Sequence, residues 1–318
     1  MKKFKYNVLI CGGTGCRATE SALVQETFVE ELEKRSLTDD IQVIATGCFG
    51  FCEQGTIVKI IPDNTFYVKV QPSDVSNLID EHFVKGRKVD KLLYSDPETK
   101  EHVADSKHMD FYKKQLRISL RNCGFIDPEK IDDYIARDGY QALATCLTEH
   151  SPVDVIEIIK KSGLRGRGGG GFSTGLKWEI TKNSVNDQKY VVCNADEGDP
   201  GAFMDRSILE GDPHSIIEAM AICGYCIGAD KGLVYIRAEY PLAIDRLKIA
   251  LDQAREYGLL GNNIFGTEFN FEIEIRYGAG AFVCGEETAL IHSMEGLRGE
   301  PTFKPPFPSV SGYLEKPT

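Results

Sequence analysis

Four cysteines within the first 52 residues have types and spacing suited to metal chemistry. Cys11 and Cys16 form a C-x4-C pair, and Cys48 and Cys52 form a C-x3-C pair after 31 intervening residues. Positions 12 to 15 read Gly-Gly-Thr-Gly, and such glycines let backbone amides approach a bound anionic group. Four thiolates are the ligand set of a 2Fe-2S cluster. The quartet therefore predicts a 2Fe-2S cluster.

Two alternatives to this cluster stay open. The first alternative is a zinc site, although cysteine-based zinc sites usually contain C-x2-C knuckles, which the quartet lacks. The second alternative is that the four thiols bind no metal. A separate C-x2-C, formed by Cys223 and Cys226, lies on an apolar helical stretch with no second pair nearby. We interpret these two thiols, like Trp178, as part of a hydrophobic core.

The sequence around the cysteines predicts a compact α/β unit over residues 1–86, whose strands and helices would position them. Short apolar runs rich in strand-forming residues alternate with helical spacing, and the cysteines fall where strands end. The expected strands are 6–10, 41–45, 56–61 and 65–70, and the expected helices are 21–37 and 72–84. Residues 87–150 read as a linker and helical lead-in, with helices expected at 111–121 and 128–137.

A glycine-rich loop is the main feature of the following residues, 151–318. Five glycines occupy the six positions from 166 to 171. A helix rather than a strand precedes them and no Gly-Lys-Ser/Thr follows, so neither a Rossmann fingerprint nor a Walker A loop is present. A flexible linker, an RGG-like RNA tract and a phosphate-binding loop remain. Flanking helical patterns in an acidic globular chain favour the phosphate loop.

Beyond this loop, strand and helix patterns alternate, which predicts a layered α/β domain with ligands at the carboxyl ends of its strands. The expected strands are 189–193, 233–237 and 269–277, and the expected helices are 153–161, 213–227, 241–257 and 286–294. Polar, glycine-containing segments follow two strands, at 194–200 and 278–288. Taken singly, their carboxylates also suit solvated loops or helix starts. Together with the glycine loop they indicate a nucleotide site.

Composition excludes several classes of partner. The 37 basic and 48 acidic residues give a net charge of −11, which opposes binding to nucleic acid. The apolar run at 8–10 is too short for a signal peptide, and no stretch approaches the ~20 apolar residues of a membrane-spanning helix. We therefore expect a cytoplasmic protein with no nucleic-acid partner and no membrane span.

The motifs described above carry two family resemblances. Residues 1–86 resemble the thioredoxin-like 2Fe-2S ferredoxins, including the small subunit of complex I type NADH dehydrogenases, at all four cysteine positions. Residues ~110 to 318 resemble the flavoprotein subunit of those dehydrogenases and its relatives in soluble NAD-linked hydrogenases and formate dehydrogenases. The matching segments are GLRGRGGGGFSTGLKW from 163, CNADEGDPG from 193, GAGAFVCGEETAL from 278 and KPPFP from 304.

The resemblance implies a fold and a set of site residues. The fold is an N-terminal thioredoxin-like ferredoxin domain followed by an α/β domain that binds FMN and NAD(H), over residues 151–318. The positions matched to FMN contacts are Gly166, Arg167, Gly168, Lys177, Asn194, Asp196, Glu197, Phe282, Gly285, Glu286 and Glu287. For the nicotinamide nucleotide, the matched positions are the aromatic Phe172 and Phe307, the acidic Asp199 and the basic Lys304.

The implied function is electron transfer between NAD(H), FMN and iron–sulfur clusters, within a multimeric and electron-bifurcating type of hydrogenase. Hydride transfer to flavin needs no protein acid or base, so no catalytic side chain is expected. Expected partners are a hydrogenase or formate dehydrogenase catalytic subunit, a small 2Fe-2S subunit and ferredoxin. An NAD-linked formate dehydrogenase, a respiratory NADH dehydrogenase module and an electron-relay subunit holding only the 2Fe-2S cluster are the alternatives.

The resemblance also implies that the chain is truncated at its C-terminus. Family members continue into a ubiquitin-like domain and a helical domain that carries a 4Fe-4S cluster. We expect that cluster in the missing region.

Overall fold

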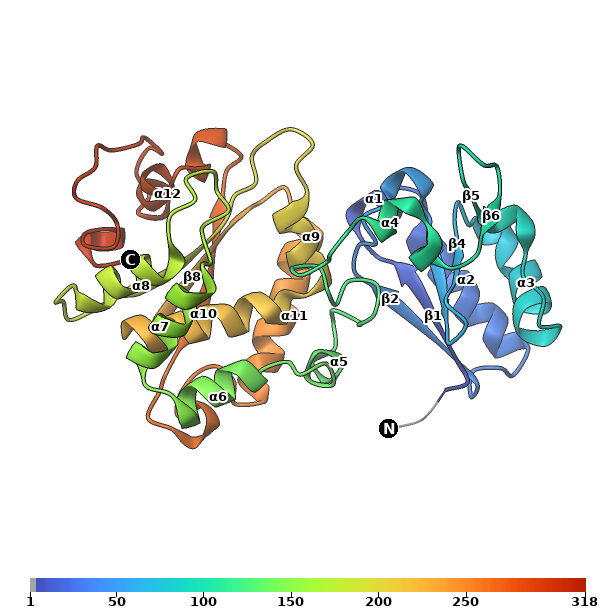
Figure 1. Cartoon of the computed structure of the whole chain (residues 1–318), viewed down its shortest axis with the longest axis horizontal. Coiled ribbons are helices and arrows are strands. Elements are labelled where there is room, and N and C mark those ends of the chain that lie inside the picture. Colours follow the sequence, from blue (N-terminus) through green and yellow to red (C-terminus); the bar gives the residue numbers. More distant parts are fainter. Residues whose placement is uncertain (1–3) are drawn as a thin grey trace. The chain divides into compact units, whose positions relative to one another are not determined.

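The computed structural model describes residues 4–318, which form two compact units (Figure 1). One unit contains the residues up to 130 together with 210–212, and the other contains 131–209 and 213–318. The segment expected to be a linker and helical lead-in is therefore divided, with 87–130 in the first unit and 131–150 in the second.

The first unit is built on a four-stranded mixed sheet with the order β2-β1-β3-β4. Strand β1 pairs in parallel with β2 and antiparallel with β3, and β3 and β4 form an antiparallel hairpin. A parallel pair needs a crossover, and helix α2 supplies it between β1 and β2. The bounds are β1 Tyr6–Cys11, α2 Ser21–Lys34, β2 Ile41–Thr46, β3 Val58–Ile61 and β4 Thr65–Tyr67.

The rest of the first unit consists of short turns and a small two-stranded sheet. The continuous helix expected at 72–84 is instead a 3-10 turn, one α-helical turn and a π-helical stretch. The bounds are α1 Thr14–Arg17, η1 Cys52–Gln54, η2 Pro72–Asp74, α3 Val75–Leu78, η3 Ile79–Val84, η4 Asp90–Leu92, β5 Tyr94–Ser95, β6 His102–Val103, η5 Ser106–His108 and α4 Asp110–Lys113. The helix expected at 111–121 is wrong, because α4 ends at Lys113.

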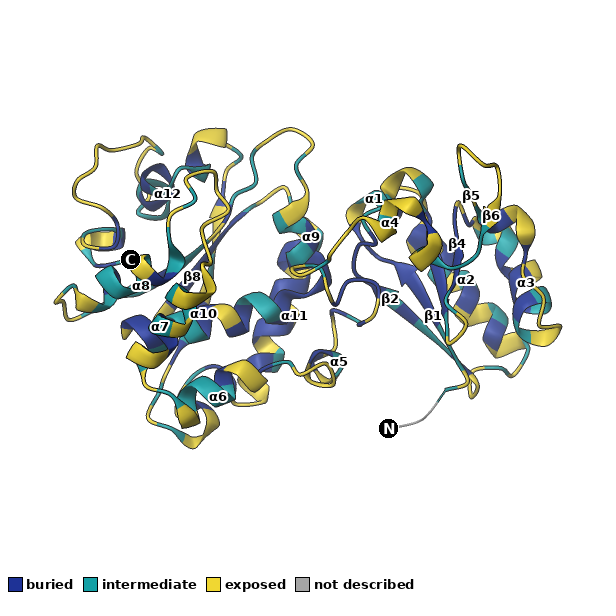
Figure 2. Cartoon of the chain, viewed as in Figure 1, coloured by how far each residue is buried: buried dark blue, intermediate teal, exposed yellow. Residues whose placement is uncertain are grey.

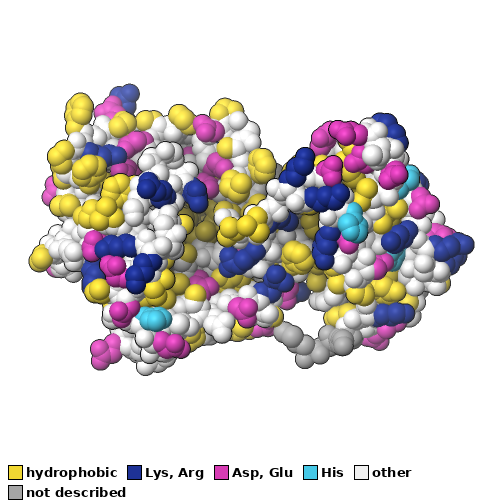
Figure 3. Space-filling model, in the orientation of Figure 1, with side chains coloured by type: hydrophobic (Ala, Val, Ile, Leu, Met, Phe, Trp, Pro, Cys, Tyr) yellow, Lys and Arg dark blue, Asp and Glu magenta, His cyan; other side chains and the backbone are white. Residues whose placement is uncertain are grey.

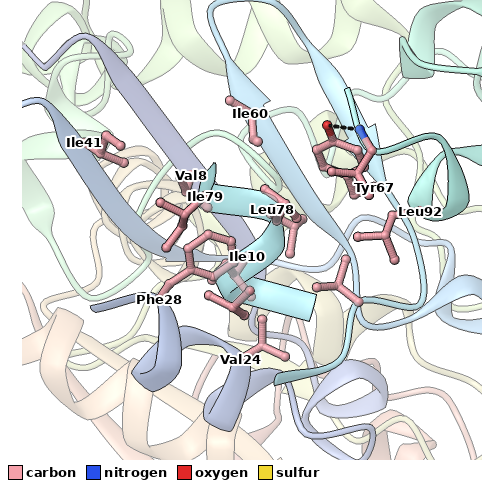
Figure 4. Close-up of a cluster of buried hydrophobic side chains, with 14 of the residues drawn as sticks. Val8, Ile10, Val24, Phe28, Ile41, Ile60, Tyr67, Leu78, Ile79 and Leu92 are labelled. Carbon is pink, nitrogen blue, oxygen red and sulfur yellow. Dashed lines mark hydrogen bonds between the residues drawn. The ribbon is translucent and has the colours of Figure 1, made fainter. Parts of the chain in front are cut away.

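A hydrophobic core joins the sheet of the first unit to α2 and α3 (Figure 4). Val8 and Ile10 of β1 pack with Phe28 of α2 and Leu78 of α3, and all four side chains are buried. The Tyr67 hydroxyl is buried here as well, and it accepts a hydrogen bond from the backbone N–H of Val89 at 3.2 Å. Burial of this apolar surface holds β1 in place, and β1 ends at Cys11.

The second unit contains a three-stranded parallel sheet with the order β7-β8-β9. Helices α10 and α11 are the two crossovers, and α10 packs against β7 and β8. The middle strand β8 is buried along its centre, among others at Val234 and Ile236, whereas β7 and β9 also carry intermediate and exposed residues (Figure 2). The bounds are β7 Tyr190–Ala195, α10 Pro213–Ile227, β8 Lys231–Arg237, α11 Pro241–Glu256 and β9 Glu272–Gly278.

Helices preceding and following this sheet complete the second unit. The bounds are α5 Ile131–Ile135, α6 Gln141–Glu149, α7 Pro152–Ser162, α8 Thr174–Asn183, α9 Met204–Gly211, η6 Ile264–Gly266, η7 Phe282–Gly285, α12 Glu287–Met294 and η8 Tyr313–Glu315. The last two residues of α9 cluster with the first unit. Among the described residues, the helices are too short or too polar to cross a bilayer. Both units are mixed α/β structures, as expected.

Candidate functional site

The four predicted cluster ligands lie at the end of the first sheet where β1 and β2 finish. Cys11 is the last residue of β1, and Cys48 follows β2, whose pairing with β1 is parallel. Cys16 is in α1, and Cys52 begins the turn η1. Three of the cysteines are buried, whereas Cys52 is exposed. Hydrogen bonds with Cys16 and Cys48, together with burial, raise the pKa of Cys11. Thiols of both pairs are therefore neighbours.

Glycine residues lie close to three of these cysteines, so that backbone without side chains approaches them. A Cβ atom at Gly13 would lie 3.0 Å from Cys48 Cβ, and one at Gly15 would lie 3.0 Å from Cys52 Sγ. A Cβ at Gly55 would lie 2.8 Å from Cys16 Sγ. Within residues 4–318, no three His, Cys, Asp or Glu side chains form a ready site for a single ion. Neighbouring thiol pairs in a glycine-lined loop fit an anionic group that is held by four thiolates.

Sequence reasoning did not single out three residues that hold the cysteine loops. Glu210, which belongs to the first unit, accepts hydrogen bonds from the Thr14 backbone N–H at 3.1 Å and the Thr14 hydroxyl at 2.5 Å. The Tyr112 hydroxyl donates to the Phe49 carbonyl at 2.9 Å, and Arg117 donates to the Cys48 carbonyl at 3.2 Å. These contacts span 63 to 196 residues of sequence, so no local pattern could predict them.

A pocket of about 260 Å³ in the second unit contains three of the predicted FMN residues. Lys177 of α8, Asn194 at the end of β7 and Glu287 at the start of α12 line it. Small-molecule sites commonly measure roughly 300–1,000 Å³. The pocket can thus enclose part of a ligand the size of FMN, with the remainder outside it.

Two lysines and two glutamates form a charged network beside this pocket. Lys177 Nζ lies 3.2 Å from Glu287 Oε2, and Lys304 Nζ lies 2.6 Å from Glu287 Oε1 and 3.0 Å from Glu286 Oε1. Burial opposes ionisation of Glu286, but hydrogen bonds from Thr288, from the Ala289 N–H and from Lys304 lower its pKa to about 2. Glu286 is also the N-cap of α12. Lys177 and Lys304, 127 residues apart in sequence, thus share one carboxylate.

The segment after β7 is tied to the segment before α12. The Asn194 side-chain amide donates to the Gly285 carbonyl at 2.9 Å, and Asn194 Oδ1 accepts from the Asp196 N–H at 3.2 Å. The two polar segments predicted at strand ends therefore meet.

Asp196 supplies a buried acceptor at this junction. Its side chain is 1% exposed, and its Oδ1 has no hydrogen-bond partner among residues 4–318. The nearest guanidinium nitrogen, Arg237 Nη1, is 4.0 Å away. Burial raises the pKa of Asp196, against the opposing charge of Arg237. An unsatisfied buried carboxylate oxygen is costly, so it fits a ligand that donates a hydrogen bond.

Glu197 has a structural role that its matched position does not suggest. Its carboxylate accepts backbone hydrogen bonds from Met204, Asp205 and Arg206 at 2.7 to 3.2 Å, at the start of α9. The Glu197 carbonyl accepts from the Tyr240 hydroxyl at 2.7 Å. These bonds fix the loop after Asp196 and occupy the carboxylate.

The glycine loop is open. Arg165 and Ser173 form an isolated antiparallel bridge, and the Gly166 N–H donates to the Phe172 carbonyl at 2.9 Å, closing the loop at its base. A Cβ at any position from 168 to 171 would meet no atom within 4 Å. The loop leads into α8, whose N-cap is Ser173. Exposed amides before a helix start fit a phosphate group.

Several predicted residues are exposed, and the structure shows no contact that joins them to one another. Phe172, Phe282 and Phe307 are 52%, 66% and 54% exposed. Arg167 and Asp199 are exposed as well. By contrast, Trp178 and Cys223, which the sequence placed in the core, line the pocket. They lie on α8 and α10 and line this pocket together with residues of β7, a tertiary relation that helical spacing alone does not reveal.

Comparison with known proteins finds a family model that is similar to most of the second unit. The sequence model of the Nuo51 FMN-binding domain matches residues 159–314. The chain is 71% identical over 206 residues to the NADP-reducing hydrogenase subunit HndC of Solidesulfovibrio fructosivorans, covering 65% of this chain and 42% of that protein. It is 36% identical over 322 residues to the NAD-reducing hydrogenase HoxS subunit alpha of Cupriavidus necator, covering 99% of this chain and 50% of that protein.

Further similarities include an NADH-quinone oxidoreductase subunit and a solved structure. An NADH-quinone oxidoreductase subunit of Rhizobium meliloti is 49% identical over 201 residues, covering 63% of this chain and 48% of that protein. A crystal structure of NAD+-reducing [NiFe]-hydrogenase matches 99% of this chain and 50% of its own chain, with 25% identity and a TM-score of 0.53. The chain spans about half the length, or less, of these relatives.

The match covers the glycine loop, the charged network and the Asn194–Gly285 contact, which are the parts of the second unit that the geometry brings together. Residues 159–314 therefore match the Nuo51 FMN-binding domain model, in a chain similar to nicotinamide-linked dehydrogenase and hydrogenase subunits.

Proposed function

We propose that this chain is the NAD(H)-linked flavoprotein subunit of a multimeric cytoplasmic hydrogenase of the electron-bifurcating type. In this proposal the second unit exchanges a hydride between a nicotinamide and FMN. The first unit, as a thioredoxin-like domain, carries single electrons on a 2Fe-2S cluster. FMN supplies the chemistry that converts a two-electron hydride into single electrons.

The observation that carries the proposal is the convergence of three distant segments on one pocket. Lys177, Asn194 and Glu287 line it, and the unsatisfied carboxylate of Asp196 follows Asn194. A family model built on FMN-binding proteins matches the same residues. A nucleotide ligand offers both a phosphate for basic groups and donors for a buried acceptor.

The chain's own residues then act by binding and orientation. Lys177 and the amide of Gly168 attract the phosphate of FMN, while Gly166 holds the base of the loop through its bond to Phe172. Lys177 must loosen its contact with Glu287 to reach the phosphate. Asp196 accepts a hydrogen bond from the flavin, and Phe282, beside Gly198, covers it. Arg167, Gly285 and Glu286 complete the FMN site.

The nicotinamide nucleotide binds on the exposed side of this site. Phe172 and Phe307 offer exposed rings for stacking, Asp199 accepts from a ribose hydroxyl, and Lys304 attracts the pyrophosphate. The similarity to an NADP-reducing hydrogenase protein makes the choice between NAD and NADP a matter for measurement.

Cys11, Cys16, Cys48 and Cys52 bind the 2Fe-2S cluster. The close approach of glycine backbone to three of these cysteines favours a compact anionic group there.

A second candidate is a respiratory-type NADH dehydrogenase module, which the 49% identity to an NADH-quinone oxidoreductase protein supports. Both candidates share the nicotinamide and flavin chemistry and differ in the partner. Proteins that co-purify with the chain from its host distinguish them: a hydrogenase catalytic subunit supports the first, and membrane-arm subunits support the second.

Anaerobic reconstitution of the chain with FMN, iron and sulfide tests the proposal. We expect bound flavin, released on denaturation and measured by fluorescence, and reduction of ferricyanide by NADH or NADPH. The two nucleotides are compared at equal concentration. A chain that binds iron and sulfide but no flavin is an electron relay, and the proposed hydride chemistry is then wrong.

A further inference from the structure

A basic segment stands out on the first unit of this acidic chain. Residues 107–121, here called the basic segment, contain five Lys or Arg residues and one acidic residue, Asp110, although the chain carries −11 overall. The basic residues are Lys107, Lys113, Lys114, Arg117 and Arg121. Lys and Arg side chains gather over α4 in Figure 3. The local charge is thus opposite to that of the whole protein.

The basic segment is attached to the loop that carries the second cysteine pair. Arg117 donates to the Cys48 carbonyl at 3.2 Å, and the Phe111 ring stacks on Phe51 with centroids 4.6 Å apart and planes at 16°. Phe51 precedes Cys52, the exposed cysteine. A protein bound to this segment would therefore lie beside the four thiols.

Like charges are concentrated here despite their mutual repulsion. Burial lowers the pKa of Lys59, and the nearby charges of Lys107 and Arg117 lower it further, against the attraction of Asp105. Lys59 Nζ lies 4.7 Å from the centre of the Phe125 ring. Asp110 offsets part of the charge through its pair with Lys113 at 3.2 Å. An excess of positive charge remains for a partner to neutralise.

Exposed apolar side chains are mixed with these charges. Leu116 is 86% exposed and Ile118 is 66% exposed. Exposed aliphatic groups only two residues apart and flanked by charges are typical of protein-binding surfaces rather than of phosphate-binding ones.

We propose that the basic segment is the docking surface for an acidic one-electron carrier protein that exchanges electrons with the cluster site of the first unit. The inference rests on the proposed 2Fe-2S cluster for the electron step but not for the binding step. One electron leaves the reduced carrier and reduces one ferric ion of the cluster, and no atom or proton is transferred. Such encounters are small, transient and steered by charge, so they weaken with salt.

Binding of a plant-type 2Fe-2S ferredoxin, an acidic carrier, tests the docking directly. The full chain is titrated with oxidised ferredoxin at 20 and 200 mM salt, using calorimetry. We expect Lys114→Glu with Arg121→Glu to raise the Kd about tenfold or more at low salt, because reversed rim charges repel an acidic partner. The matched control is Lys5→Glu with Lys88→Glu, which makes the same charge change. Lys5 lies before the start of β1, at the opposite end of that strand from Cys11. The control should stay within about twofold.

Electron exchange is measured separately by stopped-flow spectroscopy. Reduced ferredoxin should reduce the wild-type chain faster than the Lys114/Arg121 variant by about tenfold or more at low salt, with dithionite reducing both equally. Failure of the chain to assemble a cluster would refute the proposed cofactor but leave the binding test intact. Equal ferredoxin binding by both double variants would overturn the docking proposal. Tighter binding of an RNA oligonucleotide or of anionic vesicles, lost on the same Lys114/Arg121 reversal, would overturn it too.

Discussion

The two units use glycine in opposite ways around their candidate cofactor sites. In the first unit, Gly13 and Gly15 allow backbone to close on thiols, because a Cβ at either would lie 3.0 Å from a cysteine atom. In the second unit, the loop at 168–171 has no atom within 4 Å of any added Cβ. The same residue type therefore makes a tight cradle in one unit and leaves an open binding edge in the other.

This difference predicts which glycines cannot be replaced by a larger residue. Close-packed glycines cannot gain a methyl group without moving their neighbours, whereas open glycines can. A glycine-rich sequence by itself does not say which case applies. Four substitutions or conditions test the two units, the first and last of them the contrast between their glycines, and they are described in order of decreasing expected effect.

The largest effect is expected from Gly13→Ala, because it combines overpacking with loss of the cluster. The new Cβ would contact Cys48 Cβ at 3.0 Å and Cys48 Cα at 3.4 Å, so backbone near a ligand must shift. Overpacking of this kind costs roughly 1–3 kcal/mol. We expect iron and sulfide content after reconstitution to fall by more than half while flavin content is unchanged. Full iron content in the variant would contradict the tight cradle.

The next effect is a loss of stability of the second unit at acidic pH. His214 is 1% exposed, with Nδ1 2.8 Å from the Tyr140 hydroxyl and Nε2 3.2 Å from Gln253 Oε1. Burial lowers its pKa to about 4, against the hydrogen bond with Gln253. The unfolded chain takes up a proton near pH 6.5, but the folded chain does so only near pH 4. The free energy of unfolding should fall by roughly 3 kcal/mol as pH falls between these values.

Urea unfolding at several pH values, followed by tryptophan fluorescence, measures this dependence. Trp178 is the protein's single tryptophan and lies in the second unit. His214→Gln should flatten the pH profile. The matched control is His82→Gln in the first unit, where the buried histidine has the carboxylate of Asp63 3.1 Å away. An unchanged slope in the His214 variant would show that other groups cause the dependence.

A smaller effect is expected from Lys177→Ala. Loss of its ammonium group should raise the Kd for FMN about tenfold, at the lower end of the roughly 1.5–3 kcal/mol of a charged hydrogen bond because Lys177 is half-exposed. Lys182→Ala on the same helix is the control and should bind FMN as the wild type does. Flavin fluorescence quenching gives both constants. If Lys177→Ala bound FMN as tightly as the wild type, Lys177 would not be part of the FMN site.

The smallest effect is expected from Gly168→Ala. Because nothing lies within 4 Å of the added Cβ, the free energy of unfolding should change by less than about 0.5 kcal/mol. The Kd for FMN should rise about threefold, as a methyl group lengthens rather than removes an amide contact with phosphate. A large loss of stability would show that the loop is packed, which would end the contrast between the two units.

Local sequence patterns predicted the strands of the two main sheets and the four longest helices, but they gave no range for α6, α8 or α9. The helix expected at 213–227 has those bounds, because Pro213 suits a first helical position. Strands expected at 6–10 and 41–45 are present with one further residue each. The helix expected at 111–121 failed, since Phe111 and Tyr112 contact Phe51 and the chain leaves the helical path after Lys113.

For the candidate sites, residue types and spacing were enough to select the cysteines, the glycine loop and the two polar strand-end segments, since each is a local pattern. Only the tertiary structure decided how they combine. Lys177 meets Glu287 across 110 residues, and Asn194 meets Gly285 across 91. It also decided that Glu197 caps α9 and that Asp196 keeps a buried oxygen without a partner among the described residues. Parallel strands and the helices packed on them bring such distant residues together, and no periodicity along the chain encodes that proximity.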